Sequence, residues 1–174
     1  MSSFSEDLKR YHRRRFEWYE PSLYVVAWFR FGQWIRRLPA IPAFLLNLVH
    51  LPVYMVLTLL TGIHLPRGCR IGPGLRIYHF GGIVLNSEVV IGSNCTLRHN
   101  VTVGNRRDEH DVPVIGDGVD VGVGAVILGA IRIGNNVKIG ANAVVICDVP
   151  DGHTAVGNPA RCIPPAQNES ANRT

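Results

Sequence analysis

The chain has 174 residues, which is enough for one domain with an appendage and for a sizeable core. Its 18 Lys and Arg outnumber its 13 Asp and Glu, so the net charge is +5. The four cysteines show neither a CxxC motif nor a Cys/His ligand spacing, which excludes a cysteine-ligated metal site of ordinary pattern. We expect all four to be reduced, small core residues of a cytosolic protein: Cys69, Cys95, Cys147 and Cys162.

Residues 1–40 carry most of the positive charge, with eight Lys and Arg against four Asp and Glu. Such a basic end favours an acidic partner, a phospholipid surface or a nucleic acid, and a solvated helix face is the alternative. Because the segment 1–21 is polar and charged, we expect no cleavable signal peptide and a cytoplasmic location.

The next segment, 38–66, contains no Lys, Arg, Asp or Glu. A bilayer span needs about 20 apolar residues, and this segment is longer, but Pro42 and Pro52 are expected to interrupt it. Three alternatives stay open: contact with the inner face of the cytoplasmic membrane, burial within an oligomer, or a true span. Cations and tryptophans typical of a membrane interface lie just upstream: Arg30, Arg36, Arg37, Trp18, Trp28 and Trp34.

After residue 70, aliphatic residues recur every six positions, a period that fits neither a helix nor simple strand alternation. The recurrence predicts a mainly β solenoid of short parallel strands, with three hexapeptides in each triangular coil, preceded by an apolar α-helical region. The recurring positions are Ile71, Ile77, Ile83, Ile91, Leu97, Val103, Ile115, Val121, Ile127, Ile133, Ile139 and Val145.

Two irregularities break the repeat. The phase of the six-residue repeat slips by two residues between Ile83 and Ile91. The charged segment 104–114 predicts a loop that projects from the coil. We therefore predict a helical N-terminal region at 1–62, a solenoid at 63–162 and a disordered tail at 163–174.

Four segments resemble the hexapeptide-repeat acyltransferases, which are left-handed β-helices. They are IYHFGGIVLN (77–86), VTVGN (101–105), GVGAVILGAIRIGNNVKIGANAVV (122–145) and DVPDGHTAVGNPAR (148–161). Their order is similar to that of the serine acetyltransferase branch. The short apolar start and TLRHNVTVGNR (96–106) look more like O-acetyltransferases of exopolysaccharide and capsule synthesis. The resemblance implies a homotrimer, acetyl-CoA as co-substrate, no metal and no nucleic acid.

The resemblance makes His79 the general base that takes the proton of an acceptor hydroxyl. Gly81 and Gly82 would leave room for the acceptor beside it. His99 follows Leu97 as His79 follows Ile77, so we expect both rings on one corner of the solenoid. His110 matches the loop histidine of the family near the acceptor.

The chain departs from serine acetyltransferases at two acceptor-side positions. His64 and Tyr78 stand where those enzymes have aspartates. Because the ammonium group of a free amino acid favours a carboxylate, we expect a sugar hydroxyl of a surface polysaccharide or its precursor as acceptor, with serine as the alternative. A carboxylate for His79 could come from Glu88 or, in a neighbouring protomer, from Asp108, Glu109 or Asp111.

For acetyl-CoA, the resemblance implies a groove between neighbouring solenoids. Gly104 and Asn105 would lie near the thioester, and Lys138 and Arg161 near the phosphates. The pantetheine arm would pass Gly124, Ala125 and Ala141. Two other classes stay open: a zinc hydratase using His79, His99 and His110, and a non-catalytic trimeric scaffold.

Overall fold

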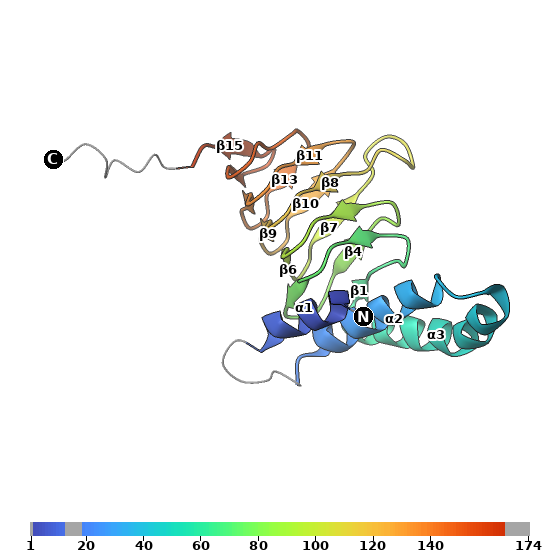
Figure 1. Cartoon of the computed structure of the whole chain (residues 1–174). Coiled ribbons are helices and arrows are strands. Elements are labelled where there is room, and N and C mark those ends of the chain that lie inside the picture. Colours follow the sequence, from blue (N-terminus) through green and yellow to red (C-terminus); the bar gives the residue numbers. More distant parts are fainter. Residues whose placement is uncertain (1, 13–18, 166–174) are drawn as a thin grey trace.

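The computed structural model describes residues 2–12 and 19–165. Three helices come first: α1 (Ser2–Tyr11), α2 (Pro21–Ile35) and α3 (Ala40–Thr61). Short strands follow from Ile63 onward and stack into a solenoid, with the helices across its N-terminal end (Figure 1). The predicted class, a mainly β solenoid after an α-helical region, is confirmed, and the change from helix to strand occurs at Gly62.

Three sheets form the sides of the solenoid, and each coil adds one strand to each side, except that the last coil adds only an isolated bridge, from Val149 to Ile133, to the second sheet. The first sheet contains β1 (Ile63–His64), β4 (Ile83–Leu85), β7 (Thr102–Gly104), β10 (Val126–Leu128) and β13 (Val144–Val145). The second contains β2 (Arg70–Ile71), β5 (Val90–Ile91), β8 (Val114–Ile115) and β11 (Arg132–Ile133). The third contains β3 (Arg76–Tyr78), β6 (Thr96–Arg98), β9 (Asp120–Val121), β12 (Lys138–Ile139), β14 (Thr154–Val156) and β15 (Arg161–Ile163). All paired strands are parallel except β14 and β15.

The strand registers explain both irregularities of the repeat. A regular coil advances by three hexapeptides, as from Ile115 to its partner Ile133. The coil from Ile71 to its partner Ile91 is longer, because the slip adds two residues at a corner. The coil from Ile91 to Ile115 is longer still, because the largely exposed loop between β7 and β8 adds six. The loop predicted at 104–114 is therefore confirmed over 105–113, whereas Gly104 ends β7 and Val114 begins β8.

The recurring aliphatic side chains fill the interior of the solenoid, and Ile77, Leu97 and Val121 are fully buried. The expectation that all four cysteines are core residues is wrong for two of them. Cys69 and Cys95 are buried, whereas Cys147 and Cys162 are exposed. Cys147 lies on a corner after β13, and Cys162 lies on the edge strand β15, so neither occupies the inward position of a hexapeptide.

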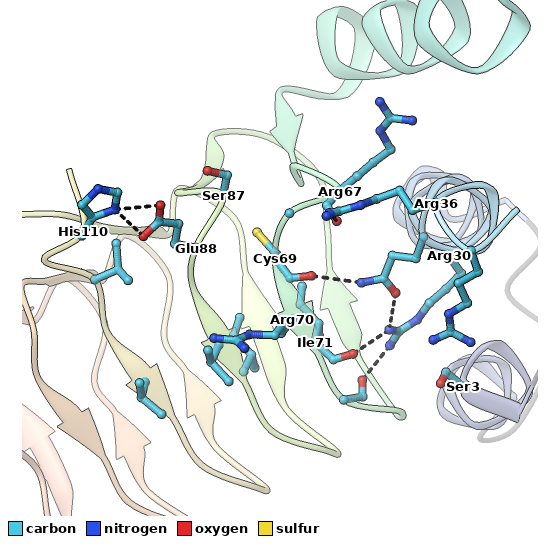
Figure 2. Close-up of a pocket in the computed structure, with 18 residues that line it drawn as sticks. Ser3, Arg30, Arg36, Arg67, Cys69, Arg70, Ile71, Ser87, Glu88 and His110 are labelled. Atoms are coloured by element: carbon cyan, nitrogen blue, oxygen red, sulfur yellow. Dashed lines mark hydrogen bonds and ion pairs between the residues drawn. The ribbon is translucent and has the colours of Figure 1, made fainter. Parts of the chain in front are cut away.

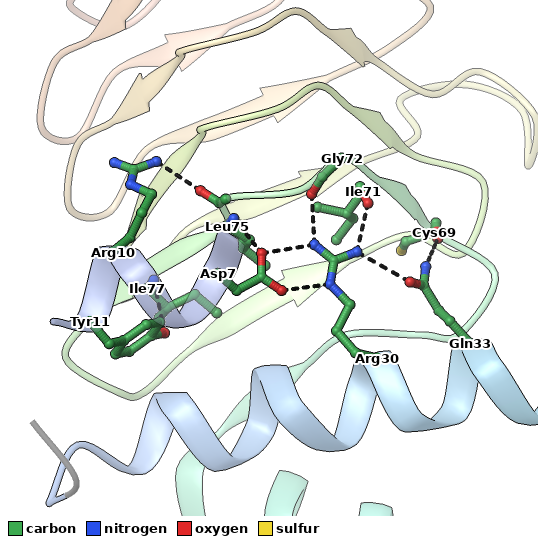
Figure 3. Close-up of polar contacts among 11 residues, drawn as sticks. Asp7, Arg10, Tyr11, Arg30, Gln33, Cys69, Ile71, Gly72, Leu75 and Ile77 are labelled. Atoms are coloured by element: carbon green, nitrogen blue, oxygen red, sulfur yellow. Dashed lines mark hydrogen bonds and ion pairs between the residues drawn. The ribbon is translucent and has the colours of Figure 1, made fainter. Parts of the chain in front are cut away.

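The helices cap the first coil of the solenoid. Amides of the first coil donate to the second coil, as Gly72 does to Ile91, but carbonyls that point away from the second coil have no strand beyond them and need donors from elsewhere. Arg30 of α2 donates to the carbonyls of Ile71 at 2.7 Å and Gly72 at 2.6 Å. The buried Asp7 of α1 accepts from Arg30 Nε at 2.7 Å (Figure 3).

Helix α3 packs along α2 and leaves its other side exposed. Trp28 Nε1 donates to the carbonyl of His50 at 3.1 Å, and His50 Nε2 donates to the carbonyl of Trp28 at 3.2 Å. The expected interruption by prolines is wrong, because α3 runs through both. Pro42 lies in the first turn, where amides need no partner, and Pro52 removes a single helical hydrogen bond. By length and composition α3 alone, among the described residues, could cross a membrane.

Two expectations fall largely outside the described residues. Trp18 lies in the gap between residues 12 and 19, and the predicted disordered tail is described only over 163–165. Ile163 belongs to β15 and pairs with Thr154, so the last strand extends one residue beyond the predicted solenoid boundary.

Candidate functional site

His79 lies at the corner between β3 and β4, and its side chain is exposed. Its φ of +64° places a non-glycine residue in the left-handed region, which is uncommon and clusters at functional sites. Gly81, with φ +119°, has open space where a Cβ would be, and Gly82 also has a positive φ. The corner therefore presents the imidazole beside a stretch of backbone that carries no side chain.

His79 and His99 lie together, as predicted. Strands β3 and β6 pair Ile77 with Leu97 and Tyr78 with Arg98, so the next residue of each strand falls on the same corner. The ring centroids are 5.9 Å apart at an interplanar angle of 72°. His99 Nδ1 is buried without a hydrogen-bond partner among the described residues, which leaves it available to a bound molecule.

The two histidines line a cavity of about 450 Å³ that also contains an ion pair. Arg98 contacts the Asp120 carboxylate through both terminal nitrogens, Nη2 to Oδ2 at 3.5 Å. Sequence reasoning missed both residues of this pair. The signal that could have found them is the register, which places Asp120 of β9 opposite Thr96 of β6. The remaining lining residues are Arg10, Tyr78, Thr96 and Val123.

The two acceptor-side residues, Tyr78 and His64, lie in different places. Tyr78 lines the cavity, and its ring lies under the guanidinium of Arg76 at 4.5 Å. His64 lies outside the cavity lining, and a hydrogen bond of 3.0 Å joins its Nδ1 to the hydroxyl of Tyr54 on α3. Within one chain, His64 therefore contacts the helical region instead of lining the cavity of the base.

His110 lies at a different place from His79 and His99. It donates from Nδ1 to both oxygens of Glu88, at 2.8 and 2.9 Å (Figure 2). This hydrogen bond and the charge of Glu88 raise the pKa of His110 above its ordinary value. The pair lines a second cavity, of about 1200 Å³, so one chain does not bring all three predicted histidines together.

The residues assigned to acetyl-CoA extend along the solenoid. Asn105, Lys138, Ala141 and Arg161 are exposed and available to a ligand. Gly104 and Ala125 are buried, so within one chain neither is open to a ligand. Gly124 has φ +68°, and a Cβ there would lie 2.2 Å from Asn142 Oδ1, so the close contact between coils requires glycine. Over residues 2–12 and 19–165, no group of three or more His, Cys, Asp and Glu could hold a metal ion.

Known proteins similar to this chain are serine acetyltransferases, although no protein-family model matches it. The Helicobacter pylori serine acetyltransferase is 46% identical over 108 residues, which are 60% of this chain and 62% of that protein. The structure of soybean serine acetyltransferase complexed with serine is 32% identical, with a TM-score of 0.77 over 93% of this chain and 68% of that one. A serine acetyltransferase structure in complex with CoA is 26% identical, with a TM-score of 0.74 over 93% of this chain and 68% of that one. The chain thus spans about three fifths of the curated H. pylori relative.

These similarities overturn one expectation. The predicted closeness to exopolysaccharide O-acetyltransferases, and with it the polysaccharide acceptor, is wrong, because the matching proteins are serine acetyltransferases. The structural matches also cover 93% of the chain, so the likeness extends beyond the solenoid into the N-terminal helices. The two missing aspartates misled the prediction, since Asp120 supplies a carboxylate to the same cavity from the next coil. The chain belongs to the serine acetyltransferase family of hexapeptide-repeat, left-handed β-helix acyltransferases.

Proposed function

We propose that the chain is a serine O-acetyltransferase that uses acetyl-CoA as donor. The observation that carries this proposal is the cavity in which His79 lies with the Arg98–Asp120 pair. Free serine is a zwitterion with a hydroxyl group. Asp120 offers a carboxylate for the ammonium group, Arg98 offers a guanidinium for the carboxylate, and His79 offers a base for the hydroxyl.

In the proposed reaction, His79 accepts one proton and later returns it. Its imidazole accepts the proton of the serine hydroxyl as the oxygen attacks the thioester carbon. The new C–O bond forms, the C–S bond breaks, and the imidazolium returns the proton to the CoA sulfur. His99, one coil away, can donate a hydrogen bond to the bound acceptor from the same corner. Holding both substrates at this corner accounts for much of the acceleration that such sites achieve.

The proposal includes a homotrimer that binds acetyl-CoA between neighbouring solenoids. A flat-sided solenoid with exposed apolar residues such as Val84 and Val114 can hide them by closed cyclic symmetry. A trimer would also bring His110 of one protomer toward the corner of another. The CoA complex of a related enzyme supports the choice of donor. Sedimentation velocity tests the assembly, and a monomer would remove every site shared between protomers.

The activity is tested by following CoA thiol release from acetyl-CoA with L-serine as acceptor. We expect Asp120→Asn and Arg98→Gln each to raise the KM for serine at least about tenfold, as loss of a charge-assisted hydrogen bond does, while the KM for acetyl-CoA changes little. Glu6→Gln is the matched control, because the Glu6 side chain is partly exposed and bonds only to Lys9 within the described chain. Folded trimer that binds acetyl-CoA but releases no CoA with serine would overturn the proposal.

A further inference from the structure

Helix α3 has an apolar face with no partner in the described chain. Only His50 and Thr61 of this helix are buried. Ten of its large apolar side chains are between 44% and 85% exposed, and the most exposed are Ile41, Met55, Leu59 and Leu60. At about 100° per residue, the ten positions cover about half of the helix circumference, opposite the two buried residues. So extensive an exposed apolar face marks an interaction site.

Arginines without acidic partners lie beside this face. Arg36, Arg37, Arg67 and Arg70 line the cavity of about 1200 Å³ between α2 and the second sheet (Figure 2). Within the described residues, none of them forms an ion pair. The cavity contains one acid, Glu88, and its carboxylate is bonded to His110. The cavity therefore has an excess of positive charge that favours an anionic occupant.

The cation cluster and the apolar face are joined physically. Arg67 donates from Nη1 to the side-chain oxygen of Asn47 on α3, and Arg36 donates to the carbonyl of Arg67 at 2.7 Å. Trp34, 45% exposed on α2, lines a neighbouring cavity together with Arg37. Guanidinium groups and an indole at the margin of an apolar helix are the elements of a membrane-interface anchor.

The packing of α2 rules out a spanning orientation for α3. The two helices lie side by side across the end of the solenoid (Figure 1). Arg30 ties α2 to the carbonyls of the first coil through a buried ion pair with Asp7. If α3 crossed a bilayer, α2 and the polar first coil would have to enter the hydrocarbon with it, which their charges forbid.

We propose that α3 and the adjoining arginines form a docking surface for a membrane that contains anionic phospholipids. The apolar half of α3 lies in the plane of the interface, at the boundary of headgroups and acyl chains. The four guanidinium groups contact lipid phosphates. The solenoid then projects into water with its His79 corner accessible.

The charge of residues 21–87 favours an anionic membrane over a second copy of the chain as the occupant of this surface. Residues 21–87 contain six arginines and no Asp, Glu or Lys. A second α3 packed on the first would bring apolar side chains and further arginines but no carboxylate. The positive charge of the cavity would then stay uncompensated. An anionic bilayer supplies both the apolar phase and the negative charge.

The test is flotation of the full-length chain with vesicles of phosphatidylcholine alone and of phosphatidylcholine mixed with phosphatidylglycerol. We expect binding to the mixed vesicles to be at least about tenfold tighter, to weaken as salt is raised, and to shift tryptophan emission to shorter wavelength. Equal binding to both kinds of vesicle, or no binding by folded chain, would overturn the proposal.

Two double variants separate the contribution of the arginines to membrane binding from that of the apolar face of α3. Arg37→Gln with Arg70→Gln removes two cations whose side chains make no hydrogen bond in the described chain, and binding to mixed vesicles should weaken about tenfold. Leu48→Gln with Leu59→Gln should abolish flotation. The controls, Arg132→Gln and Ile163→Gln, alter an exposed cation and an exposed apolar residue of the solenoid and should bind as the parent does. If the leucine variant instead lowered the mass of the assembly in lipid-free light scattering and left flotation intact, α3 would bind a second copy and the proposal would be wrong.

Discussion

The rings of His79 and His99 meet edge to face, 5.9 Å between centroids, although they belong to successive coils of the solenoid. Their proximity follows from the register of β3 on β6, which pairs Tyr78 with Arg98. Because the two-residue slip lengthens this coil, the residue that follows Arg98 lies on the same corner as His79, and that residue is His99. One can accept the hydroxyl proton while the other holds the acceptor.

This division of labour predicts different kinetic losses. His79→Asn should lower kcat for acetyl transfer to serine by about 10²- to 10⁴-fold, because the general base is lost. His99→Asn should act mainly by raising the KM for serine, since its ring only positions the acceptor. Steady-state assays of CoA release measure both, and His153→Asn, a partly exposed histidine far along the chain, is the control. Full activity in folded His79→Asn protein would show that the base lies elsewhere.

The Glu88–His110 pair predicts a pH-dependent contact. Glu88 raises the pKa of His110, so the imidazole is protonated over a wider pH range in the folded chain than in the unfolded one. The attraction is complete below the unfolded pKa of about 6.5 and is lost as pH rises through the higher folded pKa. An NMR titration of the His110 ring measures its pKa in the folded chain. Glu88→Gln should move the pKa back toward its ordinary value, and no change in that variant would show that the pair does not form in solution.

The solenoid was predictable because its determinants are local. Each inward aliphatic residue is specified by its own hexapeptide, so the six-residue period identifies both the core and the corner shared by His79 and His99. The Arg98–Asp120 pair was not predictable in the same way. The two residues are 22 positions apart, and the loop after β7 adds six residues to that coil. Only the exact strand register brings them together.

The acceptor was predicted wrongly for a related reason. The absence of aspartates at positions 64 and 78 is visible in the local motif, whereas the carboxylate of Asp120 enters the cavity from the next coil. The capping of the first coil was also hidden, because the hydrogen bonds of Arg30 to Ile71 and Gly72 depend on tertiary packing. Side-chain contacts between distant segments leave no periodic signal in a sequence.

The buried pair between Asp7 and Arg30 predicts a large loss of stability when it is broken. Asp7 also accepts from the amide of Leu75 at 2.8 Å, so Asp7→Ala leaves the buried guanidinium of Arg30 without a counter-charge and the buried amide of Leu75 without this acceptor. We expect the free energy of unfolding to fall by about 3–5 kcal/mol, measured by urea denaturation. Glu6→Gln, at a partly exposed neighbouring position, should change it by less than about 0.5 kcal/mol. A similarly small effect of Asp7→Ala would mean that α1 does not cap the solenoid.

The four thiols should divide into two classes when titrated with an aromatic disulfide reagent. Burial raises the pKa of Cys69 to about 12 and that of Cys95 to about 11, so neither should react until the chain unfolds. Cys147 and Cys162 are exposed and should react in the native chain. Four reactive thiols without denaturant would contradict the buried positions of the first two.

Within the exposed pair, Cys147 lowers the reactivity of Cys162 by raising its pKa. Partial burial and contact with Cys147, including a hydrogen bond between their side chains, raise the pKa of Cys162. Replacing Cys147 with alanine removes the contact but not the burial, so the pKa of Cys162 should fall part of the way toward its ordinary value. Because the thiolate is the reacting form, Cys162 should then be labelled faster at slightly alkaline pH than in the parent chain. Ser93→Ala, which alters a residue remote from this pair in sequence, is the control, and an unchanged labelling rate in Cys147→Ala would show that the two thiols do not interact in solution.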